Sequence, residues 1–141
     1  MSWISPLVES DAFETAPSAK PRRSWQAKLT TAFRGWKLGI RGHSSFFVHF
    51  FFAALALAGA VVLRCSLLEW CMLLACIGMV LTAELFNSAI ETIFDGLDEE
   101  TKPRVRASLD IAASAVLLAS LCALVIGAVI LGHSVSALIF P

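Results

Sequence analysis

A row of polar side chains interrupts the apolar middle of the chain, and these residues have the composition of a chemical site. Its members are Glu84, Asn87, Ser88, Glu91 and Asp95, which we call the polar face. On a helix that turns by about 100° per residue, all five lie on one side. Aligned carboxylates are suited to two tasks, because they hold a hard cation such as Mg²⁺ through oxygen and one of them can accept a proton.

A structural explanation must be weighed against this chemical one. A single acidic residue near a helix end is often only a cap or a residue of the membrane interface. Each charge at membrane depth, however, costs about 2.5–3.5 kcal/mol on insertion scales, so such residues are usually kept for a task. Several aligned polar groups over three helical turns therefore favour a functional site.

The composition indicates an integral membrane protein. Of 141 residues, 57% are apolar and 16% are charged, and the mean hydropathy is +0.76. A soluble domain of this size is rarely so hydrophobic, and the apolar residues come in blocks. The four cysteines lie in or beside these blocks without a CxxC pair, which favours free thiols over a disulfide framework or a zinc site.

Three segments of a membrane domain over residues 44–135 are predicted to cross the bilayer as helices. They cover residues 46–63, residues 67–95 with a cytoplasmic extension that carries the polar face, and residues 104–131. About 20 apolar residues are needed to cross a core of roughly 30 Å. The short connection at residues 64–66 predicts an antiparallel hairpin. His49 is the only polar residue of the first span, and a lone histidine there is usually an interface residue.

The N-terminal part is predicted to stay at the membrane surface. Residues 1–23 have the composition of a flexible cytoplasmic tail. Residues 24–43 predict an amphipathic surface helix, because Trp25, Leu29, Phe33 and Trp36 recur at threes and fours and basic residues occupy other positions. One of these basic residues, Arg34, is also a candidate for gripping phosphate groups.

The basic residues predict how the chain is oriented. Seven of the 11 lie before residue 42, and three more lie between the second and third apolar segments: Lys20, Arg22, Arg23, Lys28, Arg34, Lys37 and Arg41, then Lys102, Arg104 and Arg106. Because Lys and Arg concentrate on the cytoplasmic side, the N-terminus and the loop at 96–110 are expected inside. The far-side tail at 136–141 is expected outside. The net charge is zero, and this asymmetry indicates membrane orientation, not nucleic-acid binding.

Carboxylates and cations are thus predicted to meet at the cytoplasmic membrane boundary. Asp95 closes the second helix and Asp110 lies at the start of the third apolar segment, with basic residues nearby. This combination suits Mg²⁺ and a phosphorylated ligand. The sequence has neither a Walker-type GxxxxGK[ST] motif nor a kinase-type glycine loop, so a nucleotide site here would be of another kind.

The order Glu84-xx-Asn87-Ser88-Ala89-Ile90-Glu91, followed by Asp95 and Asp110, resembles the prokaryotic diacylglycerol kinase family, which includes the undecaprenol kinases. The resemblance covers roughly residues 28–132. It implies an all-α homotrimer in the bacterial cytoplasmic (inner) membrane, with a surface helix, three spans per subunit and active sites between subunits. There, the phosphoryl group of Mg·ATP would be transferred to a lipid hydroxyl.

The resemblance also implies roles for individual residues. Glu84 would be the general base for the lipid alcohol, and Asn87 would help to position it. Glu91 would hold Mg²⁺ and the ATP phosphates. Asp95 and Asp110 would lie beside the nucleotide. Ser114 is a loose match to a substrate-site serine that the family carries one residue earlier.

Two departures from the family pattern leave a second function open. The family places a lysine directly before the aspartate of the third helix, where this chain has Leu109. A metal-binding glutamate at the end of the surface helix is replaced by His43, and histidine suits Mg²⁺ poorly. The alternative to a lipid kinase is therefore a catalytically impaired homologue that binds lipid or nucleotide. A third possibility is a small ion carrier that uses the carboxylates of the polar face.

Overall fold

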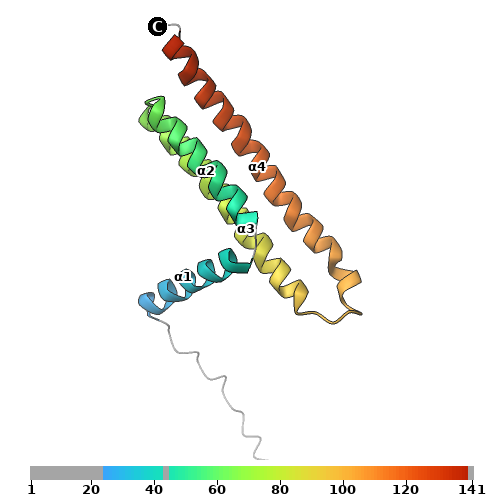
Figure 1. The fold of residues 1–141 in the computed structure, drawn as a ribbon. Coiled ribbons are helices and arrows are strands. Elements are labelled where there is room, and N and C mark those ends of the chain that lie inside the picture. The colour runs from blue at the N-terminus through green and yellow to red at the C-terminus, as the bar shows by residue number, and fades with distance from the viewer. Residues whose placement is uncertain (1–23, 43–44, 140–141) are drawn as a thin grey trace, which may run out of the picture.

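The computed structural model describes residues 24–42 and 45–139, and over these residues its secondary structure is entirely helical. Four helices follow one another: α1 (Trp25–Gly42), α2 (Ser45–Val62), α3 (Leu67–Asp95) and α4 (Lys102–Ile139). In Figure 1, α2, α3 and α4 lie side by side as long rods, and α1 projects sideways from the end where α2 begins. α3 contacts each of the other three helices.

Three of the described helices, α2, α3 and α4, are long and apolar enough to cross a membrane. This confirms the all-α fold with three candidate spans. α4 continues as a helix to Ile139, eight residues past the end expected for the third span. The placement of α1 on a membrane surface remains a prediction, and the predicted tail at 1–23 and His43 lie outside the described residues.

The hairpin between α2 and α3 is held by backbone bonds and a capping box. Arg64 has φ of 54°, a left-handed conformation that L-residues adopt at a cost, and the chain reverses within the four residues between α2 and α3. Ser66 then caps α3: its hydroxyl accepts from the backbone N–H of Glu69, and Glu69 Oε2 accepts from the backbone N–H of Ser66 at 2.6 Å. The Ser-x-x-Glu spacing satisfies the first free amides of the helix reciprocally.

One face of α3 forms the centre of the helical bundle. The buried residues of this helix recur at threes and fours: Leu73, Cys76, Val80, Glu84, Asn87 and Ser88. On α4 the buried positions include Ala112 and Ala119, whose small side chains allow two helices to approach closely in a membrane. The face of α3 that carries Glu84, Asn87 and Ser88 therefore points into the bundle.

α1 packs against α3 beside the buried end of the polar face, and a loop follows α3 at the other end. Gly39 of α1 lies so close to Leu85 that a Cβ placed on the glycine would meet Leu85 Cδ2 at 2.8 Å. α3 ends with Gly96 N–H donating to Ile93 O at 3.2 Å and Leu97 N–H to Phe94 O at 3.1 Å. Gly96 itself is right-handed, with φ of −81°, so this helix ends without a left-handed residue.

Candidate functional site

The polar face of α3 is buried at one end and open at the other. Glu84, Asn87 and Ser88 are 2%, 7% and 1% exposed, Glu91 is half-buried and Asp95 is exposed. Helix α3 alone fixes this order, because its residues rise by about 1.5 Å each along one axis. The result is a graded polar strip that leads from the interior of the bundle toward the loop after α3.

Glu84 is enclosed by two polar side chains of α2. Ser45 Oγ donates a hydrogen bond to Glu84 Oε1, and His49 Nε2 lies 3.7 Å from Glu84 Oε2. Ser45 and His49 are four residues apart, so they lie on one face of α2 and reach the carboxylate from adjacent turns. A buried carboxylate without partners would be very costly, and these two groups supply a hydroxyl donor and an imidazole.

Asn87 and Glu91 form the second polar pair. Asn87 Nδ2 donates to Glu91 Oε1 at 2.9 Å, one helical turn further along. The other polar atom of the amide, Asn87 Oδ1, is buried and accepts no hydrogen bond from any described residue; Ser88 Oγ is likewise without a partner. A buried acceptor left unsatisfied costs about 1–3 kcal/mol, so Asn87 Oδ1 is poised to accept a donor from a ligand.

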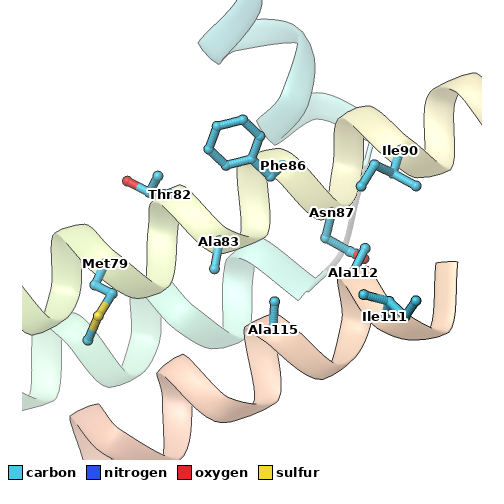
Figure 2. A pocket seen from close by; sticks show the side chains of 9 residues that line it. All are labelled: Met79, Thr82, Ala83, Phe86, Asn87, Ile90, Ile111, Ala112 and Ala115. Carbon is cyan, nitrogen blue, oxygen red and sulfur yellow. The ribbon is translucent and has the colours of Figure 1, made fainter. Parts of the chain in front are cut away.

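A pocket of about 570 Å³ adjoins Asn87 between α3 and α4. Figure 2 shows Asn87 directed from α3 toward Ala112 of α4, and Ala83 facing Ala115 across the pocket. The remaining lining residues are Met79, Thr82, Phe86, Ile90 and Ile111. An apolar pocket whose lining includes the Asn87 amide and the Thr82 side chain suits a molecule that is mostly hydrocarbon with a polar end.

A second cavity, of about 530 Å³, lies among α2, α3 and α4. His49 lines it together with aliphatic side chains of all three helices, and the Ser120 hydroxyl and the Cys76 thiol are the other groups on its wall capable of polar contacts. His49 therefore touches Glu84 on one side and apolar space on the other.

The remaining predicted site residues are not joined to these two clusters by contacts within the chain. Asp95, Asp110 and Arg34 are exposed, and none of their side chains makes a hydrogen bond or an ion pair with another described residue. Asp110 directly precedes Ile111 and Ala112, which line the pocket beside Asn87, so it lies near that pocket. Ser114 is exposed and its hydroxyl donates to Ile111 O at 2.7 Å within α4.

The oxygen atoms beside the open end of the polar face fit a magnesium ion in part. Among the described residues, no three His, Cys, Asp or Glu side chains lie close enough together to hold a metal. Mg²⁺ commonly takes only one or two protein carboxylates and completes its octahedron with phosphates and water. The Glu91 carboxylate and the unpartnered Asn87 Oδ1 are hard oxygen donors of this kind, whereas His43 lies outside the described residues.

The loop between α3 and α4 is ordered by Asp98. Its Oδ1 accepts from the backbone N–H of Thr101 at 2.8 Å, and its Oδ2 accepts from the Thr101 hydroxyl at 3.0 Å. These bonds hold the pKa of Asp98 below its usual range, because they stabilise the charged carboxylate. The bond from the Thr101 backbone N–H has the largest effect. Lys102 Nζ pairs with Glu99 Oε1 at 2.5 Å. The loop thus presents a fixed, charged edge next to Asp95.

Two residues beside Glu84 were not predicted as part of the site. The sequence predicts no role for Ser45 and an interface position for His49, but both face Glu84. Their spacing of four residues in an otherwise apolar helix is a signal for a shared face. Only the packing of α2 on α3, however, shows that this face meets the carboxylate.

Together, the fold and the site define a class: a multi-pass helical membrane protein with a buried polar face beside an apolar pocket. The prokaryotic diacylglycerol kinase family matches residues 30–131, and the chain belongs to this family of membrane lipid kinases. The matched region contains the whole polar face as well as Ser45, His49 and Asp110. Comparison with curated proteins and with solved structures gave no match.

Proposed function

We propose that the protein is a lipid kinase that transfers the γ-phosphoryl group of ATP to the hydroxyl of diacylglycerol or of a polyprenol. The observation that carries this proposal is the buried polar face of α3, where Glu84 is held by Ser45 and Asn87 by Glu91 beside an apolar pocket. Membership of the family supports lipid phosphorylation as the reaction class.

On the acceptor side, the proposal assigns the lipid hydroxyl to Asn87 and Glu84. Asn87 Oδ1, which is buried and unpartnered, accepts a hydrogen bond from the hydroxyl and orients it. Glu84 removes the proton as the hydroxyl oxygen attacks phosphorus, so it acts as general base. The pocket between α3 and α4 accommodates the hydrocarbon part of the lipid next to its hydroxyl. Ser114 is assigned to the binding of the same lipid.

On the donor side, the proposal assigns the nucleotide to the open end of the polar face. Glu91, Asp95 and Asp110 surround the phosphates from two helices, and Arg34 contributes positive charge from α1. Mg²⁺, held by Glu91 with His43 as a weaker candidate, would neutralise phosphate charge when bound. Asn87 and Glu91 are joined by a hydrogen bond across one helical turn. The proposal therefore holds the lipid hydroxyl and the nucleotide phosphates one helical turn apart.

The wider arrangement follows from the charge distribution and from the family. We place the protein in the bacterial cytoplasmic membrane with its N-terminus inside and its C-terminus outside, because Lys and Arg concentrate at one end of the spans. We assign it a homotrimer in which neighbouring subunits complete each site. The exposure of Asp110 and Arg34 supports this, since both are available to another subunit.

Phosphate transfer from labelled ATP into a lipid extract by the purified protein tests the proposal. Glu84→Gln is expected to lower kcat by about 10²–10⁴-fold, the usual contribution of a general base. Glu91→Ala is expected to raise KM for Mg·ATP. Glu69→Gln, at the other end of the same helix, is the matched control, because glutamine can still complete the capping box. Activity that survives both Glu84→Gln and Glu91→Ala contradicts the assigned roles.

A second candidate function rests on Leu109, which lies where the family carries a lysine. In this alternative the protein binds lipid or nucleotide without turnover. It predicts ATP or lipid binding by the purified protein and no phosphate transfer, even after Leu109→Lys and His43→Glu are introduced together. Activity gained by that double variant would identify a kinase that has lost these two groups.

A further inference from the structure

His49 and Ser45 contact different oxygens of the buried Glu84 carboxylate. Ser45 Oγ donates to Oε1, and His49 Nε2 lies 3.7 Å from Oε2. The serine hydroxyl uses its one proton in the bond to Glu84. A neutral imidazole nitrogen, in contrast, is a base. Of the two neighbours, His49 is therefore the one suited to take a proton from the carboxyl group.

The two members of the pair differ in exposure. The side chain of Glu84 is 2% exposed and that of His49 is 18% exposed. A general base that is buried in this way cannot return its proton directly to water, and it must lose that proton before the next turnover. His49, in the second turn of α2, is the more exposed of the two and lies one turn from Ser45, which is exposed at the start of the helix, so the imidazole offers a route from Glu84 toward the exposed start of α2.

Few other charged or titratable groups face this pair. Along the cavity next to His49, α3 adds the Cys76 thiol, while α4 adds the Ser120 hydroxyl and aliphatic residues. α1 approaches α3 through Gly39 against Leu85, and its last cation, Arg41, is exposed and has no ion pair with another described residue. Among the described residues, Glu84 is thus the ionisable group that lies next to His49.

We propose that His49 is a proton-relay residue that takes from Glu84 the proton of the lipid alcohol. The inference rests on the proposed kinase function. The lipid oxygen forms a bond to the γ-phosphorus of a nucleoside triphosphate, and the bond from that phosphorus to its bridging oxygen breaks, releasing the nucleoside diphosphate. The hydroxyl proton passes to Glu84 Oε2, then to His49 Nε2, and finally to solvent. The present 3.7 Å separation shortens in the working complex, as is common when ligand-free sites close.

The pH dependence of kcat in His49→Gln tests the relay. The wild-type kcat is expected to rise with pH, because only a neutral imidazole can accept a proton from Glu84. In His49→Gln this rise is expected to disappear and kcat to fall by at least about tenfold, with KM for lipid unchanged. A purely structural role would instead change KM or folding and keep the rise.

Three further variants keep the test decisive. Imidazole added to His49→Ala is expected to restore part of kcat, and imidazole added to Glu84→Gln is expected to restore none. His133→Gln, which removes a histidine at the opposite end of the bundle, is expected to keep the wild-type profile. A wild-type pH profile and kcat in His49→Gln, or no rescue of a folded His49→Ala variant, would overturn the relay.

Failure of the relay and failure of the proposed function give different results. If wild-type protein transfers no phosphate to lipid, the kinase function itself is wrong. If wild-type protein is active and His49→Gln matches it at every pH, only the relay is wrong. The ¹⁵N resonance of the His49 imidazole adds a readout without turnover, because Glu84→Gln is expected to move it; a resonance that stays in place contradicts the contact on which the relay depends.

Discussion

A carboxylate that is 2% exposed, as Glu84 is, must be matched by donors, because removing one partner of a buried charge is far more costly than losing a surface pair. The donor here is the Ser45 hydroxyl, and Asn87 in the same way fixes Glu91. At this scale Glu84 and Glu91 each have a partner that holds one carboxylate oxygen. The stability of the two carboxylates therefore depends on Ser45 and His49 of α2 and on the Asn87 amide of α3.

Ser45→Ala tests this dependence. The variant keeps the helix but removes the hydrogen bond to Glu84, so we expect a loss of about 1–3 kcal/mol in the free energy of unfolding. Ser45→Thr keeps the hydroxyl and is the matched control. Thermal denaturation of the detergent-solubilised protein provides the measurement, and equal midpoints for Ser45→Ala and wild type would contradict the assigned bond.

At the scale of the elements, α3 positions the site because it is the helix that every other helix contacts. Its buried end meets α2 and α4, and its open end reaches the loop ordered by Asp98. α1 is tied to it at Gly39. The position of α1, which carries Arg34, therefore depends on how closely Gly39 approaches Leu85.

Gly39→Leu is expected to push α1 away from α3. A Cβ at this position already meets Leu85 Cδ2 at 2.8 Å; Gly39→Ala requires only a shift of that flexible side chain, but a leucine does not fit. Gly35→Leu is the matched control, because a Cβ there meets nothing within 4 Å. Cross-linking of α1 to α3 and KM for ATP are the measurements, and identical behaviour of the two leucine variants would contradict the contact.

The loop after α3 is expected to loosen in acid. Folding lowers the pKa of Asp98 through its bonds from Thr101, so the stabilisation is complete above the ordinary aspartate pKa. This stabilisation is lost as the pH falls from about 4 through the lowered pKa that Asp98 has in the folded loop. The Thr101 amide signal in NMR follows this change. Asp98→Asn, which keeps an acceptor oxygen but no charge, should remove the pH dependence, and a signal that stays constant in wild type would contradict the assignment.

At the scale of the whole molecule, a single chain leaves most of its apolar surface uncovered. The share of buried residues in the apolar windows of α2, α3 and α4 is 11%, 33% and 17%, so these surfaces face lipid or other subunits. Asp110 and Arg34, which the proposed mechanism needs near the phosphates, also face outward. A homotrimer with sites between subunits would use these exposed groups and part of the exposed apolar surface.

Mixing two inactive variants tests shared sites. Glu84→Gln and Asp110→Asn subunits, combined before assembly, are expected to recover about a quarter of wild-type activity if each site draws these residues from different, randomly chosen subunits. Each variant alone should be inactive, and two separately assembled samples mixed afterwards form the control. No recovery in the co-assembled sample, with the trimer mass confirmed, would contradict shared sites.

The sequence by itself determined the helical, three-span architecture and the side of α3 that carries Glu84, Asn87, Ser88, Glu91 and Asp95. It could do so because the length of an apolar run and the helical repeat are local properties of the chain. The signature that points to the lipid kinase family lies within one helix for the same reason, and the match over residues 30–131 confirmed it.

Only the tertiary structure decided which residues surround that face. Ser45 and His49 lie 39 and 35 positions before Glu84 in the sequence, and their meeting depends on the rotation and depth of α2 against α3. The unpartnered oxygen of Asn87 likewise depends on what α4 brings opposite it, here Ala112. Such contacts arise from packing between helices, and no local pattern of residues encodes the angle and register at which two helices meet.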